Sequence, residues 1–258
     1  LSALAAYIPR DRVASILHPE RPLARDGVAL IADISGFTPL TETLAQKGPE
    51  GAEELTRLLN TTLSRMIALL ESQGGEVVKF SGDAITVVFP AVWEELGIAT
   101  RRAWQAAEAM QSAMSEFATM QTSAGPVALG MKIGIGAGEV LAAQVGGVRQ
   151  RWEYIVAGDP LLQVAQAEGQ AQRGEIVLSP QAQAIIAPGP VQPHPLAQPG
   201  WERVQNPEAA EAVLRAYVPS VVSAWLGEEL QDWLAVLRTM SVLFIGVAGP
   251  QRFMQSRY

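Results

Sequence analysis

The chain has 258 residues, 48% of them hydrophobic, with a formal net charge of -7, two histidines and no cysteine. The acidic balance argues against non-specific binding to nucleic acid or to anionic membranes, which needs a basic face, and the lack of cysteine excludes disulfides and thiolate metal sites. No apolar stretch approaches the ~20 residues of a membrane helix, so we expect no membrane span. The absence of cysteine is compatible with the cytoplasmic location that we expect.

The N-terminal segment, residues 1–27, is predicted to be a lead-in that covers an edge of a sheet. It combines a short helical pattern, Ala6–Leu17, with a segment that contains proline and arginine, His18–Asp26. The apolar run that starts at Val28 is too short for a helix and ends on Asp33. It predicts a buried strand that brings one carboxylate to the edge of the sheet.

A glycine turn follows this strand. Ser35, Gly36 and Thr38 lead into a segment that is predicted to be helical from Pro39. A glycine turn that opens a helix presents free backbone N–H groups and the positive end of the helix dipole. Both favour a phosphate group.

A second carboxylate is predicted at the tip of a hairpin. After a long amphipathic helix, Glu50–Gln73, two β-rich runs within Val77–Phe89 flank Asp83. A strand end and a hairpin tip can bring Asp33 and Asp83 together, and facing carboxylates usually hold a divalent cation such as Mg²⁺ or Mn²⁺. Beside a phosphate cradle, this pair indicates a nucleoside triphosphate. The alternative is that Asp33 only caps the helix and Asp83 is an ordinary turn residue.

The remainder of the chain continues the alternation of helices and strands. One helix is predicted over Trp93–Met120, and two strands, Ala128–Glu139 and Val140–Val145, are predicted to be joined through a Gly-rich turn. The elements predicted after them are a strand at Arg151–Val156, a helix at Asp159–Ala171, a short strand at Ile176–Leu178 and a Pro- and Gln-rich loop to Gly200. This order predicts an α+β or α/β fold with helices against one mixed sheet.

Two of these stretches resemble the signature of class III nucleotidyl cyclases, and most closely the first (C1-type) domain of tandem cyclases like soluble adenylyl cyclase. They are Ala32-Asp33-Ile34-Ser35-Gly36-Phe37-Thr38 and Lys79-Phe80-Ser81-Gly82-Asp83-Ala84. The resemblance implies an α+β fold with a ferredoxin-like βαββαβ core and additional strands and helices. It also implies conversion of ATP to 3′,5′-cyclic AMP and pyrophosphate between two cyclase domains, with two magnesium (or manganese) ions.

The resemblance further implies roles for individual residues. Asp33 and Asp83 would be catalytic and would each bind both metal ions, with the carbonyl group of Ile34 as a further ligand. The residues that would lie against the phosphates are Ser35, Gly36, Phe37, Thr38 and Lys132. Taken by itself, Lys132 is a lone cation in an apolar strand, and the alternative is a lysine whose charged end simply reaches solvent.

A third motif departs from the family pattern. Within Tyr154–Glu168, Leu162 and Gln166 stand where the family has an asparagine that orients the ribose and an arginine that neutralises the reacting phosphate. Leucine has no hydrogen-bond donor and glutamine has no charge, so neither can do this work. We therefore expect the metal- and triphosphate-binding half of a tandem adenylyl cyclase, inactive or very weak without a second domain or a homodimer mate.

Three more positions bear on the partner site. Lys79 and Val156 match positions near the base or the second, degenerate site of the pair, where relatives bind a regulatory anion such as bicarbonate. The arginine that helps to form that anion pocket matches Ala165, which argues against bicarbonate control. The alternative for Lys79 is an ion pair with a nearby acid.

A short internal repeat suggests how the chain is divided. Ala6-Tyr7-Ile8-Pro9 recurs as Ala216-Tyr217-Val218-Pro219, and the later apolar run Val242–Val247 has Gly246 where Asp33 stands. The offset of about 210 residues is a domain length. We predict a first cyclase homology domain at 28–205, a helical linker at 206–240 and the start of a second domain at 241–258, whose exposed strand would dock or swap. Chance similarity of short apolar segments is the alternative.

Two other functions stay open at this point. One is a non-catalytic regulatory cyclase-homology module that binds nucleotide or only pairs with another domain. The other is a guanylyl cyclase, because the residues that select the base would lie in the second domain.

Overall fold

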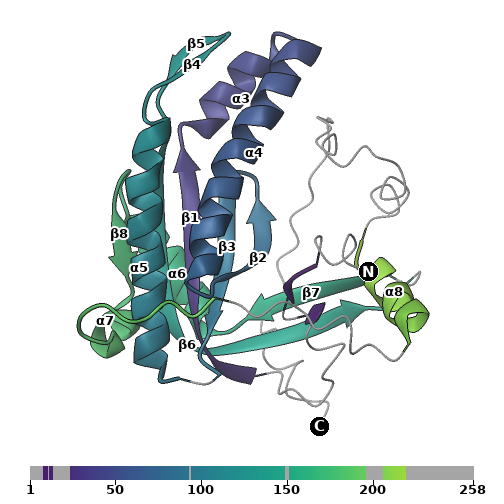
Figure 1. Ribbon diagram of the computed structural model, residues 1–258, viewed down its shortest axis with the longest axis vertical. Coiled ribbons are helices and arrows are strands. Elements are labelled where there is room, and N and C mark those ends of the chain that lie inside the picture. The colour runs from purple at the N-terminus through teal and green to yellow at the C-terminus, as the bar shows by residue number, and fades with distance from the viewer. Residues whose placement is uncertain are drawn as a thin grey trace.

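The fold is built around one strand, β1 (Ala24–Ser35), which is hydrogen-bonded to a neighbour on each side (Figure 1). The computed structural model describes residues 8–10, 12–13, 24–92, 94–148, 151–195 and 206–218. β1 pairs antiparallel with β3 (Ala84–Pro90) and with β6 (Gly130–Gly146). The predicted strand is confirmed, although it begins before Val28.

The main sheet has six strands in the order β2-β3-β1-β6-β7, with β8 paired parallel to β6 and all other pairs antiparallel. The further strands are β2 (Glu76–Ser81), β7 (Trp152–Ala157) and β8 (Ile176–Leu178). The helices are α3 (Phe37–Ala45), α4 (Pro49–Ser72), α5 (Leu96–Met114), α6 (Asp159–Gln170), α7 (Pro180–Ile185) and α8 (Pro207–Arg215). The order β1, α4, β2, β3, α5, β6 is the βαββαβ core that the family resemblance implies.

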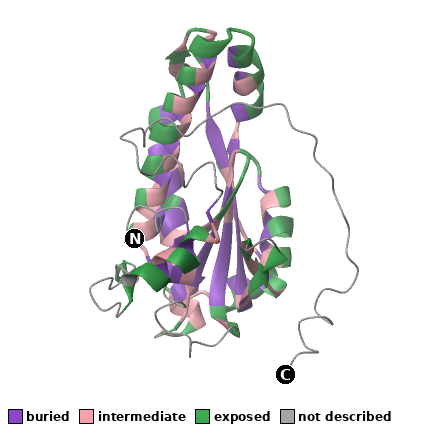
Figure 2. Cartoon of the chain, turned by 90° about the vertical axis from the view of Figure 1, so that its right-hand side faces the viewer, coloured by how far each residue is buried: buried purple, intermediate pink, exposed green. Residues whose placement is uncertain are grey.

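Helices cover both faces of the sheet. α4 and α5 lie on the face to which β1 presents Val28, Leu30, Ala32 and Ile34, and their apolar stripes close the main core there. α6 packs on the opposite face against β1 and β6. Figure 2 shows the buried residues concentrated along the strands and on the sides of the helices that face them. Burying each large aliphatic side chain in this way contributes about 1.5–3 kcal/mol.

The predicted amphipathic helix is confirmed as α4. Its buried stripe contains Leu55, Leu58, Thr62, Met66 and Leu70. The helix stops where Gly74 adopts a φ of 81°, in the left-handed region where glycine is favoured.

The predicted pair of strands between 128 and 145 is wrong, because β6 is a single strand from Gly130 to Gly146. Its glycines do not form a turn. A Cβ atom at Gly134 would lie 2.5 Å from the backbone N of Glu168, and one at Gly136 would lie 2.6 Å from the carbonyl O of Pro160. The glycines are therefore the places where α6 comes into contact with the strand backbone.

The helix predicted over Trp93–Met120 is too long at both ends, and Trp93 itself lies outside the described residues. α5 ends at Met114, and the chain continues through a 3₁₀ turn (Ser115–Phe117) into a small hairpin of β4 (Met120–Thr122) and β5 (Gly125–Val127). Glu54 of α4 accepts a hydrogen bond from the backbone N of Ser123 at 3.0 Å, which attaches the hairpin to the helix. This contact between distant residues has no local signal in the sequence.

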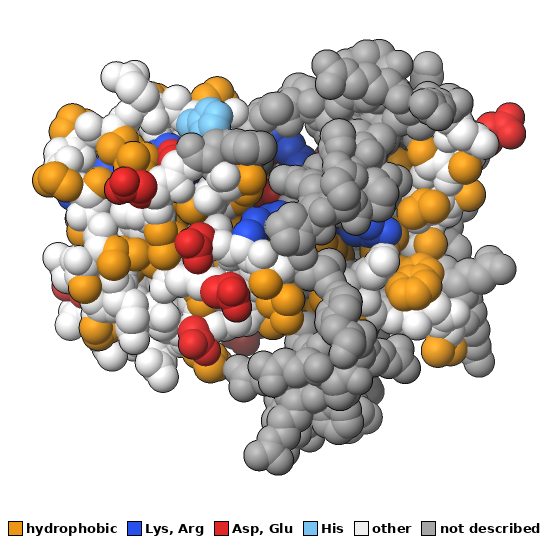
Figure 3. Space-filling model, turned by 90° about the horizontal axis from the view of Figure 1, so that it is seen from below, with side chains coloured by type: hydrophobic (Ala, Val, Ile, Leu, Met, Phe, Trp, Pro, Cys, Tyr) orange, Lys and Arg blue, Asp and Glu red, His pale blue; other side chains and the backbone are white. Residues whose placement is uncertain are grey.

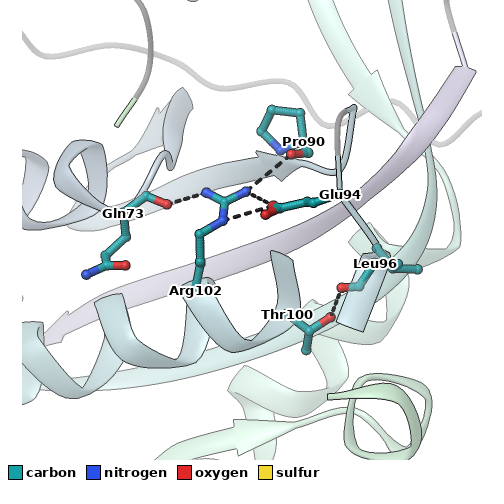
Figure 4. A network of polar contacts seen from close by, with 6 residues as sticks. All are labelled: Gln73, Pro90, Glu94, Leu96, Thr100 and Arg102. Atoms are coloured by element: carbon teal, nitrogen blue, oxygen red, sulfur yellow. Dashed lines mark hydrogen bonds and ion pairs between the residues drawn. The ribbon is translucent and has the colours of Figure 1, made fainter. Parts of the chain in front are cut away.

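A buried ion pair fixes the end of the sheet that is remote from the Asp33 end of β1. Arg102 of α5 is 2% exposed and donates to Glu94 and to the carbonyl groups of Gln73 and Pro90 (Figure 4). Pro90 is the register partner of Gly27, near the start of β1. The pair therefore joins the end of α4, the end of β3 and the start of α5.

The outer half of β6 forms an arm with β7 that extends toward α8 (Figure 1). The backbone N of Trp152 donates to the carbonyl of Ala216 at 3.1 Å, and Tyr217 bonds to Gln144. Arg12 donates to the Tyr217 hydroxyl at 2.7 Å and lies 4.8 Å from its ring centroid. These contacts hold the second copy of the predicted repeat, at Ala216–Val218, against β7 and Arg12.

The predicted strand Val242–Val247 and the tail at 241–258 lie outside the described residues. No helix in the described ranges combines the length and the apolar character needed to cross a bilayer. On the face that Figure 3 shows, acidic side chains lie as separate groups and a few basic ones lie beside the grey atoms.

Candidate functional site

The two predicted carboxylates come together at one end of the sheet. Asp33 is in register with Ala84 of β3, and the backbone N of Ile34 donates to the carbonyl O of Asp83 at 3.3 Å. Asp83 occupies the two-residue turn between β2 and β3, after Gly82, whose φ of 67° suits this turn. The strand end and the hairpin tip therefore meet as the sequence predicts.

The ionisation of Asp33 depends on its burial and on the charges around it. Burial raises the pKa of Asp33 above its ordinary value, and the neighbouring carboxylates of Asp83 and Glu168 raise it further, while Lys132 lowers it. The Asp33 side chain nevertheless keeps 25% of its surface exposed. Asp33, together with the carboxylates of Asp83 and Glu168 that act on it, carries three negative charges against the one positive charge of Lys132, an excess that a cation could balance.

Lys132 lies next to Asp33 in register on β6. Its Nζ is 2.6 Å from Oε1 of Glu168 and 3.5 Å from Oδ2 of Asp33, and the hydrogen bond to Glu168 raises the pKa of Lys132. Glu168 was not singled out from the sequence. The sequence places Lys132 on one face of a strand and Glu168 on one face of a helix, but it does not show that these two faces meet. They meet because Gly134 lets the backbone of α6 lie close to β6.

The backbone turn after Asp33 opens a helix, as predicted, but α3 begins at Phe37 rather than at Pro39. Gly36 has a φ of 92° and no side chain caps the helix. A Cβ atom at Gly36 would lie 2.8 Å from the carbonyl O of Ala128, so only glycine fits. The first amide groups of α3 therefore face outward beside the carboxylates, where an anion is favoured.

The side chains of the turn differ in exposure. Ser35 is half-buried in β1, Phe37 is buried in the core, and Thr38 is exposed. The Thr38 hydroxyl lies 3.4 Å from Oδ2 of Asp83 in a long hydrogen bond. Phe37 thus anchors the helix, and Thr38 links it to the second carboxylate.

A divalent ion would fit the donor set on chemical grounds, since two carboxylates and the carbonyl of Ile34 are the oxygen ligands that Mg²⁺ and Mn²⁺ prefer. Within the described ranges, no group of three or more His, Cys, Asp or Glu side chains is arranged to hold a metal by itself. Backbone oxygen and ligand phosphate would therefore have to complete the coordination.

The positions predicted to face a partner domain are on the outside of the molecule. Leu162 is 62% exposed, and Gln166, four residues later on α6, is exposed on the same side, as is Ala165. Val156 is half-buried in β7 opposite Ala142.

Lys79 is exposed on β2, where the ladder shifts register between Val77 and Lys79. In the described part of the chain, Lys79 makes no hydrogen bond or ion pair. The alternative ion pair considered for this lysine is therefore not present among these residues.

Comparison with known proteins agrees with this arrangement. The family model described as the adenylate and guanylate cyclase catalytic domain matches residues 24–194. Adenylate cyclase type 10 of Homo sapiens is 31% identical over 182 residues, which cover 69% of this chain. They cover only 11% of that relative, so this chain corresponds to a small part of its length.

Solved structures of similar fold include two cyclases. The adenylyl cyclase CyaB from P. aeruginosa is 25% identical, with a TM-score of 0.52 over 63% of this chain and 80% of that one. The guanylyl cyclase Cya2 is 27% identical, with a TM-score of 0.51 over 64% of this chain and 79% of that one. The structural neighbours thus include one adenylyl cyclase and one guanylyl cyclase.

Proposed function

Because this chain belongs to the class III adenylate and guanylate cyclase catalytic domain family, we propose that it is the metal- and triphosphate-binding half of an adenylyl cyclase that converts ATP to 3′,5′-cyclic AMP and pyrophosphate. The observation that carries the proposal is the meeting of Asp33 and Asp83 beside the uncapped start of α3. The adenylyl rather than the guanylyl assignment follows the similarity to adenylate cyclase type 10.

The protein groups have separate tasks in this reaction. Asp33, Asp83 and the carbonyl of Ile34 would hold the metal ions, and the amides of Gly36, Phe37 and Thr38 would orient the β and γ phosphates. When bound, two Mg²⁺ or Mn²⁺ ions supply activation of the ribose 3′-hydroxyl and neutralise charge on the pyrophosphate. The ribose 3′-hydroxyl gives up its proton to solvent, and its oxygen forms a bond to the α phosphorus as the bond from that phosphorus to the pyrophosphate oxygen breaks.

The partner would complete the site. Leu162 and Gln166 lie exposed on α6 and offer neither the hydrogen bond to ribose nor the positive charge for the α phosphate. A second cyclase domain or a homodimer mate would have to provide both. The same two residues favour the alternative function, a regulatory module without activity of its own.

A gain-of-function experiment separates these readings. The double variant Leu162→Asn, Gln166→Arg changes two exposed side chains, so the core is left intact. If the chain can assemble a site with a second copy, this variant should form cyclic AMP from ATP with Mn²⁺ at least ~100-fold faster than the unmodified chain, the scale of one transition-state contact. Assays with GTP beside ATP decide the base.

The control is the triple variant that also carries Asp33→Ala, which should be inactive. An active unmodified chain would contradict the assignment as an incomplete half. Activity that survives Asp33→Ala would contradict the metal-binding role. If the double variant is inactive and Asp33→Ala also leaves Mg²⁺-dependent ATP binding unchanged, the regulatory alternative is correct.

A further inference from the structure

The lysine of the phosphate site is already engaged. Lys132 binds Glu168 at 2.6 Å and lies 3.5 Å from Asp33, so its charge is balanced by carboxylates of the same chain. A nucleoside triphosphate carries about four negative charges, and two divalent ions that are shared with Asp33 and Asp83 cannot leave a surplus of positive charge for it. A further cation near the phosphate turn would correct this balance.

The turn between α6 and β8 is held rigidly against β6. The backbone N of Gly174 donates to the carbonyl of Met131 at 2.7 Å, and the backbone N of Ile133 donates to the carbonyl of Glu175 at 3.0 Å. The side-chain amide of Gln111 donates to both of these carbonyl groups, at 3.0 and 3.1 Å. This turn carries Arg173, which therefore has a fixed backbone position.

The side chain of Arg173 lies directly over Gly130, the first residue of β6. A Cβ atom at Gly130 would overlap Cγ, Cδ and Nε of Arg173, so the missing side chain makes room for the arginine. Gly130 is in register with Ser35, the residue that starts the phosphate turn. Paired residues on antiparallel strands have Cα atoms about 4.5–5.5 Å apart, which places the arginine next to this turn.

The arginine also lies on the correct face of the sheet. Gly134 and Gly136 face α6, and Lys132 meets Glu168 of the same helix, so the even-numbered residues of β6 share one face. Gly130 belongs to this series, and β6 has no bulge between these positions. Arg173 thus stands on the same face as Asp33 and Lys132, displaced toward the start of α3.

Arg173 is exposed, and among the described residues it makes no hydrogen bond or ion pair. We propose that Arg173 binds the distal phosphates of the nucleoside triphosphate, beside the turn of Ser35 to Thr38. This inference rests on the proposed function and adds a residue to its phosphate site. The guanidinium suits the task because its planar set of donors matches phosphate oxygens in pairs.

The test is calorimetric titration of the whole chain with Mg²⁺ and α,β-methylene-ATP. This analogue is not consumed during the titration, because its cyclisation would have to break a P–C bond. Arg173→Ala should weaken binding about 10- to 100-fold, the loss expected for a charge-assisted hydrogen bond to phosphate. Arg173→Lys should recover part of it. Inorganic tripolyphosphate should show the same loss, whereas AMP, which lacks the distal phosphates, should bind equally to all variants.

The matched control is Arg65→Ala, which removes the same charge from an exposed pair with Glu116 on the other face of the sheet. If Arg173→Ala binds the analogue as tightly as Arg65→Ala while Asp33→Ala binds it weakly, the inference is overturned and the proposed function stands. If the unmodified chain binds neither the analogue nor tripolyphosphate, both are rejected. An equal loss of AMP binding would assign Arg173 a structural role only and would also overturn the inference.

Discussion

Two clusters of charged side chains lie at opposite ends of β1, and they differ in how exposed they are and in how far their charges balance. At the remote end, the Arg102 and Glu94 side chains are 3% and 16% exposed, and backbone carbonyls accept the remaining arginine donors. At the site, the Lys132, Asp33 and Glu168 side chains are 30%, 25% and 19% exposed, and carboxylates outnumber the lysine. The first cluster is saturated by the chain itself, whereas the second has a charge imbalance that a ligand can correct.

The largest effect on stability is expected at the saturated cluster. Arg102→Ala leaves Glu94 and two carbonyl groups without their donor in a buried place, which should lower the free energy of unfolding by about 3–5 kcal/mol. Urea unfolding measures this loss. In Arg65→Ala, which breaks an exposed pair, the loss should stay below about 1 kcal/mol. Similar losses in both variants would mean that the two clusters do not differ as described.

A smaller loss is expected where α6 meets β6. Gly134→Ala would place a Cβ atom 2.5 Å from backbone atoms of Val164 and Glu168, so the helix must shift, at a cost of about 2–3 kcal/mol. The control is Gly169→Ala on α6, whose Cβ atom would meet nothing within 4 Å. This variant should gain up to about 1 kcal/mol from helix propensity. A neutral Gly134→Ala would show that the site does not depend on this close approach.

The charge imbalance itself predicts a small gain in stability. Because the pKa of Asp33 is raised in the folded state, the folded chain holds this proton more tightly than the unfolded chain does. The charged form therefore opposes folding at neutral pH, and this effect disappears as the pH falls through the folded pKa toward the unfolded value. Asp33→Asn, in EDTA at pH 7, should raise the free energy of unfolding by less than about 1 kcal/mol, since water screens this partly exposed group.

Urea unfolding at pH 7 and at pH 4 measures this difference, which should shrink at the lower pH. With excess Mg²⁺ and nucleotide the order should reverse, because ligand binding stabilises only the chain that retains Asp33. A loss of stability in Asp33→Asn without ligand would show that the carboxylate is a structural group like Glu94.

The smallest effect concerns a third charged contact, between α4 and the β4–β5 hairpin. Hydrogen bonds from Ser123 lower the pKa of Glu54, so its contribution is present at neutral pH and is lost as the pH falls through the folded pKa. Glu54→Ala should speed amide exchange in the hairpin severalfold at pH 7 with little change in overall stability. Glu53→Ala, on the preceding residue of α4, is the control and should leave the hairpin unchanged.

The positions of Asp33, Asp83 and the turn at Gly36 could be predicted from the sequence, because each depends on residues that are close together in the chain. The apolar run before Asp33, the hairpin around Asp83 and the glycine at position 36 each have a short-range physical cause. The resemblance to the cyclase family supplied the order of the core. Ser179, which caps α7 by accepting from the backbone N of Ala182, had a local signal as well, a serine followed by proline, although the segment was predicted to be a loop.

The rest depends on contacts between distant segments. Glu168 and Arg173 reach the site only because Gly134 and Gly130 allow α6 and the following turn to lie on β6, and spacing along the chain gives no sign of this. The glycines of this segment instead predict a Gly-rich turn that joins two strands, Ala128–Glu139 and Val140–Val145, where the structure has the single strand β6. A glycine that admits a neighbouring element and a glycine that bends the backbone look alike in a sequence.

β1 has a ladder partner on both sides at Asp33, with Ala84 on one side and Lys132 on the other, whereas Asp83 sits on a surface turn of two residues. The amide of Asp33 can exchange only when the whole sheet opens, while that of Asp83 can exchange through a local fluctuation. In the proposed metal site, the backbone of Asp33 is thus fixed for the lifetime of the folded state. The backbone of Asp83 can adjust within microseconds, which would let the site accept ions of different radius.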